Sequence, residues 1–190
     1  MADALSFAIK PTLTGNLVAL RPVTEEDARG LASVDAETLR LTGTHGTATF
    51  EELKRWYHSR ADHDDRVDLS IIERATRRWI GEVVLNDLDA ANNSCGFRIL
   101  LAAENDYGRG FGSEATRLVL AHAFDTVGLH RVELEVYDFN PRARRVYEKV
   151  GFVYEGTKRQ ALRWGEEWVD AHLMAMLDSD WRRSKDGVLP

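Results

Sequence analysis

A cluster of glycines is the stretch of this sequence best suited to chemistry. Gly108, Gly110 and Gly112 alternate along NDYGRGFGSEATRLVL, which runs from Asn105 to Leu120 and ends in a helical pattern. Glycines let backbone N–H groups approach a ligand closely, and the first N–H groups of a helix attract anions. The stretch therefore predicts a phosphate-binding loop at the start of a helix.

Three kinds of phosphate loop compete for this stretch. A P-loop requires G-x-x-x-x-G-K-[ST], and the sequence has no Gly-Lys pair. A dinucleotide fingerprint, G-x-G-x-x-G/A, fits Gly110, Gly112 and Ala115, but seven residues, AAENDYG, separate the preceding strand from the loop. A third pattern, R/Q-x-x-G-x-G/A, fits from Tyr107 to Gly112, with tyrosine in the first position. Its backbone N–H groups over residues 109–113 are expected to hold a pyrophosphate.

A second cluster lies downstream, in NPRARRVYEKVGF. Asn140, Arg144 and Tyr147 are spaced by about one helical turn each, so they predict one polar face of a short helix. Asn140 can also cap that helix, and an apolar stripe through Ala143 and Val146 includes Tyr147. Spacing alone therefore leaves both a functional and a core position open for Tyr147.

Together the two clusters resemble the GNAT superfamily of acetyltransferases. The second cluster matches N-x-x-A-x-x-x-Y-E-K-x-G-F from Asn140 to Phe152, and GRGFGSEA lies at the right distance upstream. The opening LVALRPVTEEDA and the closing GTKRQAL also look like this superfamily, so the resemblance covers about Leu17 to Leu177. It is closest to the branch that acetylates the N-termini of ribosomal proteins. Spermidine N-acetyltransferases are similar through the same two clusters.

The resemblance implies acetyl-CoA as co-substrate and direct attack by a primary amine in a ternary complex. The acceptor is expected to be a protein N-terminus, a polyamine or a small-molecule amine, and a non-catalytic acyl-CoA-binding module is the alternative. The strand CGFRILL is expected to part from the next parallel strand, so that its backbone follows the pantetheine. The residues assigned to the cofactor are Leu100, Leu101, Ala102, Tyr107, Gly108, Arg109, Gly110, Phe111, Gly112, Ser113, Asn140, Arg144 and Tyr147.

Tyr147 and Glu82 are the predicted catalytic residues. A thiol titrates near ~8.5 and a phenol near ~10, so the Tyr147 hydroxyl can protonate the leaving thiolate at a modest cost. Glu82 lies in phase with apolar residues on the strand WIGEVVL and is the expected general base. Its rivals are Asp87, His45 and Glu104, and a chain of waters is the remaining alternative.

These residues require strands and helices to position them. Alternating apolar residues predict strands over 17–22, 67–73, 78–87, 95–102 and 130–138, and a closing hairpin over 152–162 and 166–177. Helical spacing and caps predict helices over about 24–34, 50–60, 112–127 and 140–151. The expected fold is α+β, a GNAT fold: a mixed, mostly antiparallel twisted sheet of about six to seven strands with a splayed parallel pair and about four helices.

Composition narrows the classes of function. The 190 residues fit one acetyltransferase domain, with a core over about 15–178 and a flexible tail over about 180–190. The net charge of −6 argues against a nucleic-acid surface and favours a cationic or neutral partner. The single cysteine, Cys95, fits a reducing compartment, and no apolar stretch approaches the ~20 residues of a membrane span. We expect a cytoplasmic protein with no metal and no nucleic-acid or membrane partner, with a homodimer as an open option.

Overall fold

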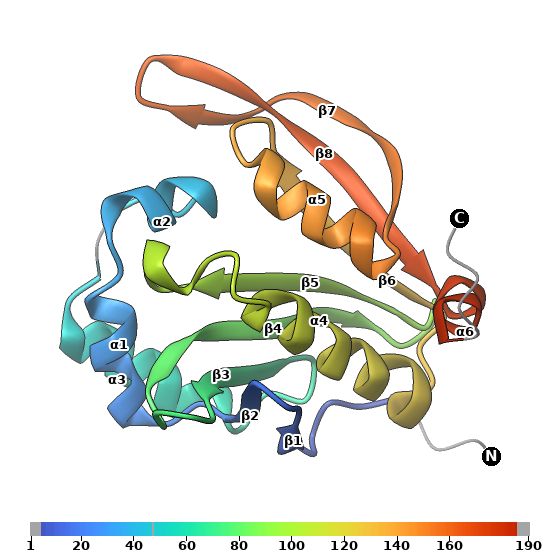
Figure 1. Cartoon of the computed structure of the whole chain (residues 1–190), viewed down its shortest axis with the longest axis horizontal. Coiled ribbons are helices and arrows are strands. Elements are labelled where there is room, and N and C mark those ends of the chain that lie inside the picture. Colours follow the sequence, from blue (N-terminus) through green and yellow to red (C-terminus); the bar gives the residue numbers. More distant parts are fainter. Residues whose placement is uncertain (1–4, 47, 186–190) are drawn as a thin grey trace.

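One mixed sheet organises the protein in a computed structural model that describes residues 5–46 and 48–185 (Figure 1). Its strands are β1 (Leu13–Thr14), β2 (Val18–Pro22), β3 (Val67–Glu73), β4 (Trp79–Asp89), β5 (Ser94–Leu101), β6 (Arg131–Tyr137), β7 (Val153–Trp164) and β8 (Glu167–Leu177). Their order across the sheet is β1-β2-β3-β4-β5-β6-β8-β7, and only β5 and β6 pair in parallel. The predicted α+β fold is confirmed, with eight strands in the described residues instead of six to seven.

The α-helices of the described residues connect and cover these strands. They are α1 (Ala28–Ala32), α2 (Ala36–Leu41), α3 (Phe50–Arg60), α4 (Phe111–Ala121), α5 (Pro141–Val150) and α6 (Asp178–Lys185). Residues 122–127 prolong α4 as a π-helical segment up to Gly128, where the predicted helix ends. Within the described part of the chain, no helix is both long enough and apolar enough to cross a membrane.

Helices α2 and α6 are absent from the sequence prediction. Helix α2 is a short helix whose N-cap, Asp35, accepts a hydrogen bond from the Thr38 N–H at 2.7 Å. Helix α6 replaces most of the expected flexible tail: Trp181 is buried, stacks on Phe124, and donates its indole N–H to Asp125 Oδ1 at 3.0 Å. One buried tryptophan among charged residues gives no periodic apolar pattern, so the sequence could not reveal this anchor. Residues 186–190 of the predicted tail lie outside the described residues.

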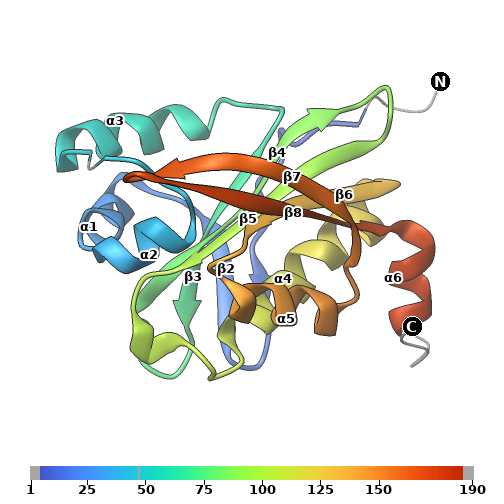
Figure 2. The ribbon, with the colours of Figure 1, turned by 90° about the horizontal axis from the view of Figure 1, so that it is seen from above.

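Alternation along β4 and β5 gives the sheet two different faces. Val83 lies opposite Ile99, and this face packs against α4 and α5 in the hydrophobic core. Glu82 and Arg98 lie on the other face, because each is one residue out of phase with that pair. Tyr57 of α3 contacts Glu82 there. Figures 1 and 2 show α3 on one side of the sheet and α4 and α5 on the other.

The parallel pair β5 and β6 remains joined over only a short length. The residue pairs run from Ser94 opposite Arg131 to Gly96 opposite Glu133. Beyond them β5 continues beside β4, and β6 continues beside β8. The sheet therefore divides into two parts at the splayed pair that the sequence predicts, as Figure 1 shows.

Candidate active site

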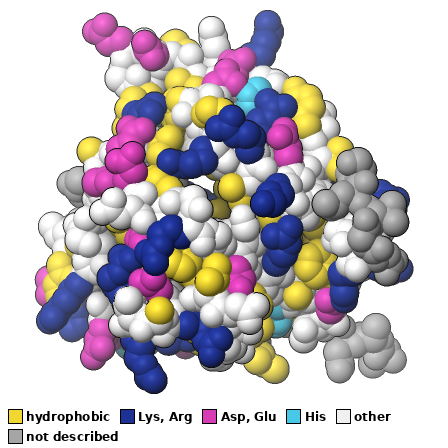
Figure 3. Space-filling model, viewed as in Figure 1, with side chains coloured by type: hydrophobic (Ala, Val, Ile, Leu, Met, Phe, Trp, Pro, Cys, Tyr) yellow, Lys and Arg dark blue, Asp and Glu magenta, His cyan; other side chains and the backbone are white. Residues whose placement is uncertain are grey.

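A cavity of about 870 Å³ lies where β5 and β6 part. It is lined by β4, β5 and β6, by the glycine loop (residues 107–113), by one side of α5, and by residues of α2 and α3. Figure 3 shows this side of the molecule hollowed near its centre, with Lys and Arg side chains around the hollow. A single cavity thus connects the glycine loop on one face of the sheet with Glu82 on the other.

Most of the predicted site residues meet at this cavity. Those that line it are Glu82, Leu100, Leu101, Tyr107, Gly108, Gly110, Phe111, Gly112, Ser113, Asn140 and Tyr147. Three predicted residues, Ala102, Arg109 and Arg144, are not among its lining residues. Five cationic residues that the sequence analysis does not assign also line it: Arg66, Arg98, Arg142, Arg145 and Lys149.

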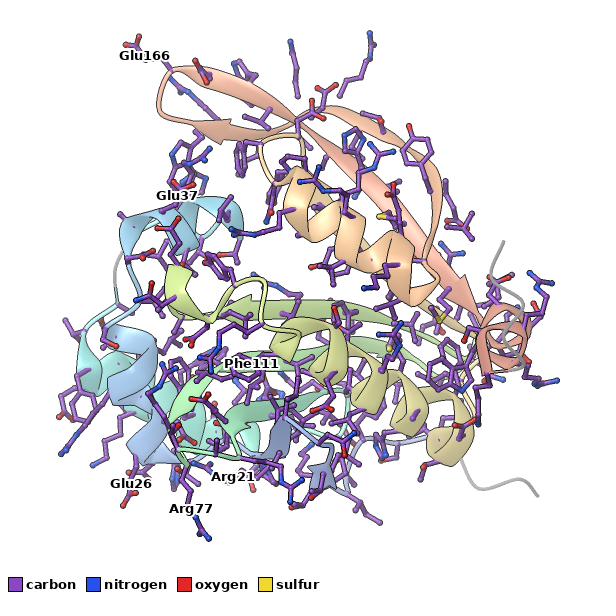
Figure 4. The ribbon with its side chains drawn as sticks, in the orientation of Figure 1. Arg21, Glu26, Glu37, Arg77, Phe111 and Glu166 are labelled. Carbon is purple, nitrogen blue, oxygen red and sulfur yellow. The ribbon has the colours of Figure 1, made fainter. Side chains whose placement is uncertain are left out.

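The glycine loop has a backbone that side chains would strain. Gly108 has φ +72° and Gly110 has φ +88°, both in the left-handed region that favours glycine. Gly110 is the N-cap of α4. Phe111 follows it at the first turn of the helix, where Figure 4 labels it, and is buried in the core with 3% of its surface exposed. The conformation of the turn therefore depends on Gly108 and Gly110, and the buried Phe111 ring fixes the turn to the core.

The first N–H groups of α4 are directed away from the helix. The N–H of Glu114 is the first to bond within it, to the Gly110 carbonyl at 3.0 Å. The N–H groups of residues 111–113 therefore precede the helical ladder and have no acceptor within it. A Cβ on Gly112 would make only ordinary contact, 3.6 Å from Leu101 Cδ1, so the fold itself leaves room for a side chain there. This arrangement matches a cradle for an anion.

Arg109 is engaged by acidic residues beside the loop. Its guanidinium bonds Glu73 Oε1 at 2.8 Å, approaches Asp106 Oδ1 at 3.7 Å, and lies over the Phe111 ring. The backbone of Arg109 keeps its place in the glycine loop, while the side chain supports the turn from behind.

Tyr107 contributes its side chain to the wall of the cavity. Its hydroxyl bonds Thr38 Oγ1 of α2 at 2.9 Å and donates to the Leu101 carbonyl at 3.3 Å. The Arg142 guanidinium lies 3.7 Å from the centre of its ring. Tyr107 therefore joins α2, β5 and α5 around the mouth of the glycine loop.

The backbone of β5 faces the cavity at alternate residues only. The Ala102 N–H donates to the Ile80 carbonyl of β4 at 2.9 Å, so the backbone groups of Ala102, and by alternation those of Leu100, face β4. The backbone groups of Ile99 and Leu101 face the parted side, where β6 no longer pairs. Of the predicted pantetheine-binding residues Leu100, Leu101 and Ala102, only Leu101 has its backbone groups on this parted side, together with Ile99.

Helix α5 presents a different basic face from the predicted one. Arg144 bonds Glu148 Oε1 at 3.0 Å and lies over the Tyr154 ring, outside the cavity lining. Instead Arg142, Arg145 and Lys149 line the cavity, at i, i+3 and i+7. That spacing was visible in the sequence, but it could not show which side of α5 faces the glycine loop.

Asn140 has the capping role that the sequence allows and a second contact. Its side-chain oxygen accepts from the Ala143 N–H at 3.1 Å, and its Nδ2 donates to the Leu41 carbonyl at 3.2 Å. Asn140 therefore starts α5 and ties it to the end of α2 across the cavity. Both helices owe part of their position at the site to this one side chain.

Tyr147 combines the two positions that its spacing leaves open. Its ring is buried and packs edge-on against Phe97 and Phe152, with ring centres 6.0 and 5.9 Å away. The residue also lines the cavity. Burial raises the pKa of its hydroxyl above the ordinary value, so the phenol keeps its proton at neutral pH. No hydrogen bond engages that hydroxyl within residues 5–46 and 48–185, so it is free to donate into the cavity.

Glu82 is a buried carboxyl group at the cavity wall. It is 4% exposed and accepts a hydrogen bond from the Tyr57 hydroxyl of α3. Burial raises the pKa of Glu82 to about 7; the Tyr57 hydrogen bond opposes this shift, and the charges of Asp68 and Asp27 add to it. A carboxyl group with this pKa exchanges a proton readily near neutral pH.

The rivals of Glu82 lie elsewhere. Asp87, His45 and Glu104 are exposed and are not among the lining residues, and His45 instead stacks on Trp164 of the β7–β8 hairpin. Across the described ranges, no group of three or more His, Cys, Asp or Glu residues is arranged to hold a metal ion.

Several proteins named as acetyltransferases are similar to this chain in sequence. A profile of the family described as "Acetyltransferase (GNAT) domain" matches residues 18–153. Spermidine N(1)-acetyltransferase from Vibrio cholerae is 30% identical over 133 residues, which cover 70% of this chain and 76% of that protein. Spermidine N(1)-acetyltransferase from Escherichia coli K12 is 28% identical over 149 residues, covering 73% and 74%.

Solved structures share the fold. A crystal structure of spermidine N-acetyltransferase from Vibrio cholerae in complex with CoA and spermine matches with a TM-score of 0.81 at 24% identity, covering 88% of this chain and 99% of that one. A GCN5-related N-acetyltransferase from Brucella melitensis matches with a TM-score of 0.78 at 25% identity, covering 95% and 84%. With the family profile spanning most of the chain, this protein belongs to the GNAT family of acetyltransferases and is an acyltransferase.

Proposed function

We propose that this enzyme transfers an acetyl group from acetyl-CoA to a primary amine by direct attack in a ternary complex. The observation that carries the proposal is the single cavity through the parted strands, which is lined by both the glycine loop and Glu82. Two ligands can enter from opposite faces of the sheet and meet between β5 and β6. Binding the two reactants side by side lowers the barrier, because the amine and the thioester are already oriented for reaction.

The residues at this cavity fit acetyl-CoA. Its pyrophosphate suits the free N–H groups of residues 111–113, because they lie at the positive end of α4. Its amide-rich arm suits the backbone of Ile99 and Leu101, which lacks a strand partner on that side. Arg142, Arg145 and Lys149 supply positive charge at the same side. When bound, acetyl-CoA supplies the acetyl thioester, and the remaining chemistry falls to side chains of this chain.

Glu82 is proposed to receive the proton of the acceptor ammonium, directly or through water. An amine attacks only when its lone pair is free, so the site must hold a base. The raised pKa of about 7 makes Glu82 a stronger base than an ordinary carboxylate while leaving much of it ionised at neutral pH. Its position between Tyr57 and the cavity fixes the carboxylate orientation.

Tyr147 is proposed to protonate the leaving thiolate. Its burial keeps the phenol neutral, and its hydroxyl is free of other partners within the described residues. The Phe97 and Phe152 rings hold it in one orientation. The separate locations of Glu82 and Tyr147 support a division of labour in which one side chain takes a proton and another gives one.

Two acceptor classes have specific support. The named relatives support a polyamine, because two of them are spermidine acetyltransferases. The resemblance to the branch that acetylates ribosomal proteins supports a protein N-terminus. In both cases the reacting group is a primary amine, which the proposed chemistry requires.

The test is an acceptor panel in which release of free CoA thiol is measured with purified enzyme. We expect at least one primary amine to exceed the hydrolysis background clearly, with the acetylated product identified by mass spectrometry. Failure of every polyamine, peptide and small amine would contradict the proposal. Running the panel with and without EDTA tests the expected independence of metal, and light scattering tests the homodimer.

A further inference from the structure

The acidic residues that line the cavity are already satisfied by the protein. They are Glu52, Glu82, Asp106 and Glu135. Glu52 accepts from the Thr49 N–H and hydroxyl, and Glu82 accepts from Tyr57. Asp106 accepts from Arg78, and Glu135 pairs with Lys158. Asp106 and Glu135 are thus paired with cations, whereas Glu52 and Glu82 accept only from neutral groups and keep their negative charge.

Most of the basic residues that line the cavity have no ion pair in the part of the chain that the structure describes. Arg66 pairs with Asp68 at 2.7 Å, and Arg142 lies over the Tyr107 ring. Arg98, Arg145 and Lys149 have no acidic partner within residues 5–46 and 48–185. The cavity therefore offers its ligands three cations that form no ion pair with any described residue, beside the Glu52 and Glu82 carboxylates with their neutral partners.

The three unpaired cations divide between the two faces of the sheet. Arg145 and Lys149 belong to α5, which packs with α4 on the face that holds the glycine loop. Arg98 lies on the other face, which it shares with Glu82. Phosphates of the cofactor account for the cations of α5, whereas Arg98 shares the acceptor face with Glu82 and forms no ion pair within the described residues.

We infer that the acceptor is a primary amine that also carries an anionic group, a carboxylate or a phosphate, and that the Arg98 guanidinium binds this group. The inference rests on the proposed function and names its acceptor class. A guanidinium binds carboxylate or phosphate through two parallel hydrogen bonds, which matches either anion. A polyamine would instead place further positive charge beside an unpaired cation, which is unfavourable.

The register also limits the length of such an acceptor. Arg98 lies opposite Val84, so it is the diagonal neighbour of Glu82 on the same face. Diagonal neighbours in an antiparallel pair lie roughly 7–8 Å apart. An acceptor whose amine is close to Glu82 can reach Arg98 with its anion across a short linker. Arg98 therefore selects an acceptor both by the charge of its second group and by the length of its linker.

The experiment compares acceptors that differ only in their second group. Straight-chain amines of equal length bearing a carboxylate, a phosphate, a methyl group or a second amine are assayed by thiol release, with spermidine alongside. We expect the wild-type enzyme to favour one of the anionic amines over the neutral and cationic ones by about 10- to 100-fold in kcat/KM. The preferred anion separates a carboxylate acceptor from a phosphate acceptor. An ω-amino acid series then gives the preferred linker.

Substitution of Arg98 must change this preference selectively. Arg98→Gln is expected to raise KM for anionic amines far more than for the neutral amine, and Arg98→Glu to shift the preference toward diamines. Arg159→Ala, an exposed arginine on β7, is the matched control and should change nothing. A wild-type preference for spermidine, or an equal loss for every acceptor in Arg98→Gln, would overturn the inference.

A binding measurement keeps the inference separate from the proposed function. Calorimetry of the anionic amine in the presence of CoA should give heat with the wild-type enzyme and none with Arg98→Gln. If no amine is acetylated, the proposed function fails, yet this difference in binding still supports the role of Arg98. Equal binding to both proteins, or binding to neither, refutes it.

Discussion

The chemistry at the residue scale depends on two side chains whose surroundings alter them in the same direction. Burial raises the pKa of both Glu82 and Tyr147. For the carboxyl group this creates a base that is usable near neutrality. For the phenol it keeps the hydroxyl group protonated, so that Tyr147 can donate a proton. A pair of groups, each adjusted to one half of a proton transfer, is what acid–base catalysis needs.

Tyr147→Phe should lower kcat by about 100-fold while CoA binding stays nearly unchanged, because only the donated proton is lost. The ring remains to fill its place against Phe97 and Phe152. Thiol release gives kcat, and calorimetry gives CoA affinity. Tyr154→Phe, at an exposed tyrosine, is the control. Wild-type turnover in Tyr147→Phe would remove this residue from the acid role.

Glu82 predicts the pH dependence of the enzyme. Its pKa is raised to about 7, and it must be ionised to accept a proton. Activity should therefore rise with pH up to about 7 and then level off, with loss below that value as the carboxyl group is protonated. Glu82→Gln should lower kcat/KM and abolish this rise. Retention of the same pH profile in Glu82→Gln would assign the ionisation to another group.

At the scale of elements, one glycine of the loop is needed for folding and another for binding of the ligand. Gly110 has φ +88°, so Gly110→Ala should destabilise the free protein by about 1–2 kcal/mol. Gly112 has helical backbone and space for a methyl group, so Gly112→Ala should leave stability equal or raise it by about 0.4–1 kcal/mol.

CoA affinity should nevertheless fall in Gly112→Ala, because the added methyl group occupies the side from which phosphate approaches the backbone. Urea unfolding and calorimetry measure the two quantities on the same protein. Undiminished CoA affinity in Gly112→Ala would show that the ligand does not approach the loop at this residue.

Local signals explain how much of these elements the sequence could predict. The glycine loop and α5 are marked by contiguous patterns, and their positions agree with the structure. The contact between Tyr57 and Glu82 joins residues far apart in the chain, and no pattern in either segment indicates it. The cavity-facing side of α5 was equally hidden, because Arg142 and Arg144 are both arginines on a helix with several basic residues. Alternation on the strand WIGEVVL did place Glu82 in phase with apolar residues, but no sequence pattern singles out Arg98 on β5.

Across the whole molecule, the two parts of the sheet are held together at their shared end and by the chain's last helix. Helix α6 follows β8 directly, and Trp181 contacts Phe124 and Asp125 at the end of the α4 segment. The C-terminal part of the sheet is thereby tied to the helix that carries the glycine loop. Stability and site geometry are linked through this contact.

Trp181→Ala should destabilise the protein by about 3–5 kcal/mol, because a large buried ring is removed. Trp181→Phe should cost less, since the ring remains and mainly the hydrogen bond to Asp125 is lost, worth about 1 kcal/mol. Urea unfolding measures both. Trp168→Ala is the control, because Trp168 is 58% exposed. Equal stability of Trp181→Ala and wild type would mean that α6 is not docked in solution.

The short pairing of β5 with β6 leaves β5 with an interior edge. Past Gly96, the N–H and C=O groups of Ile99 and Leu101 face neither β4 nor β6. Unpaired edges of this kind recruit other strands and promote aggregation. Tyr107 blocks this edge by donating its hydroxyl to the Leu101 carbonyl, with α2 behind it. Tyr107, which stands where Gln or Arg is usual in the phosphate loop, thus protects this edge from pairing with other strands. Its loss should lower the solubility of the protein more than its catalytic rate.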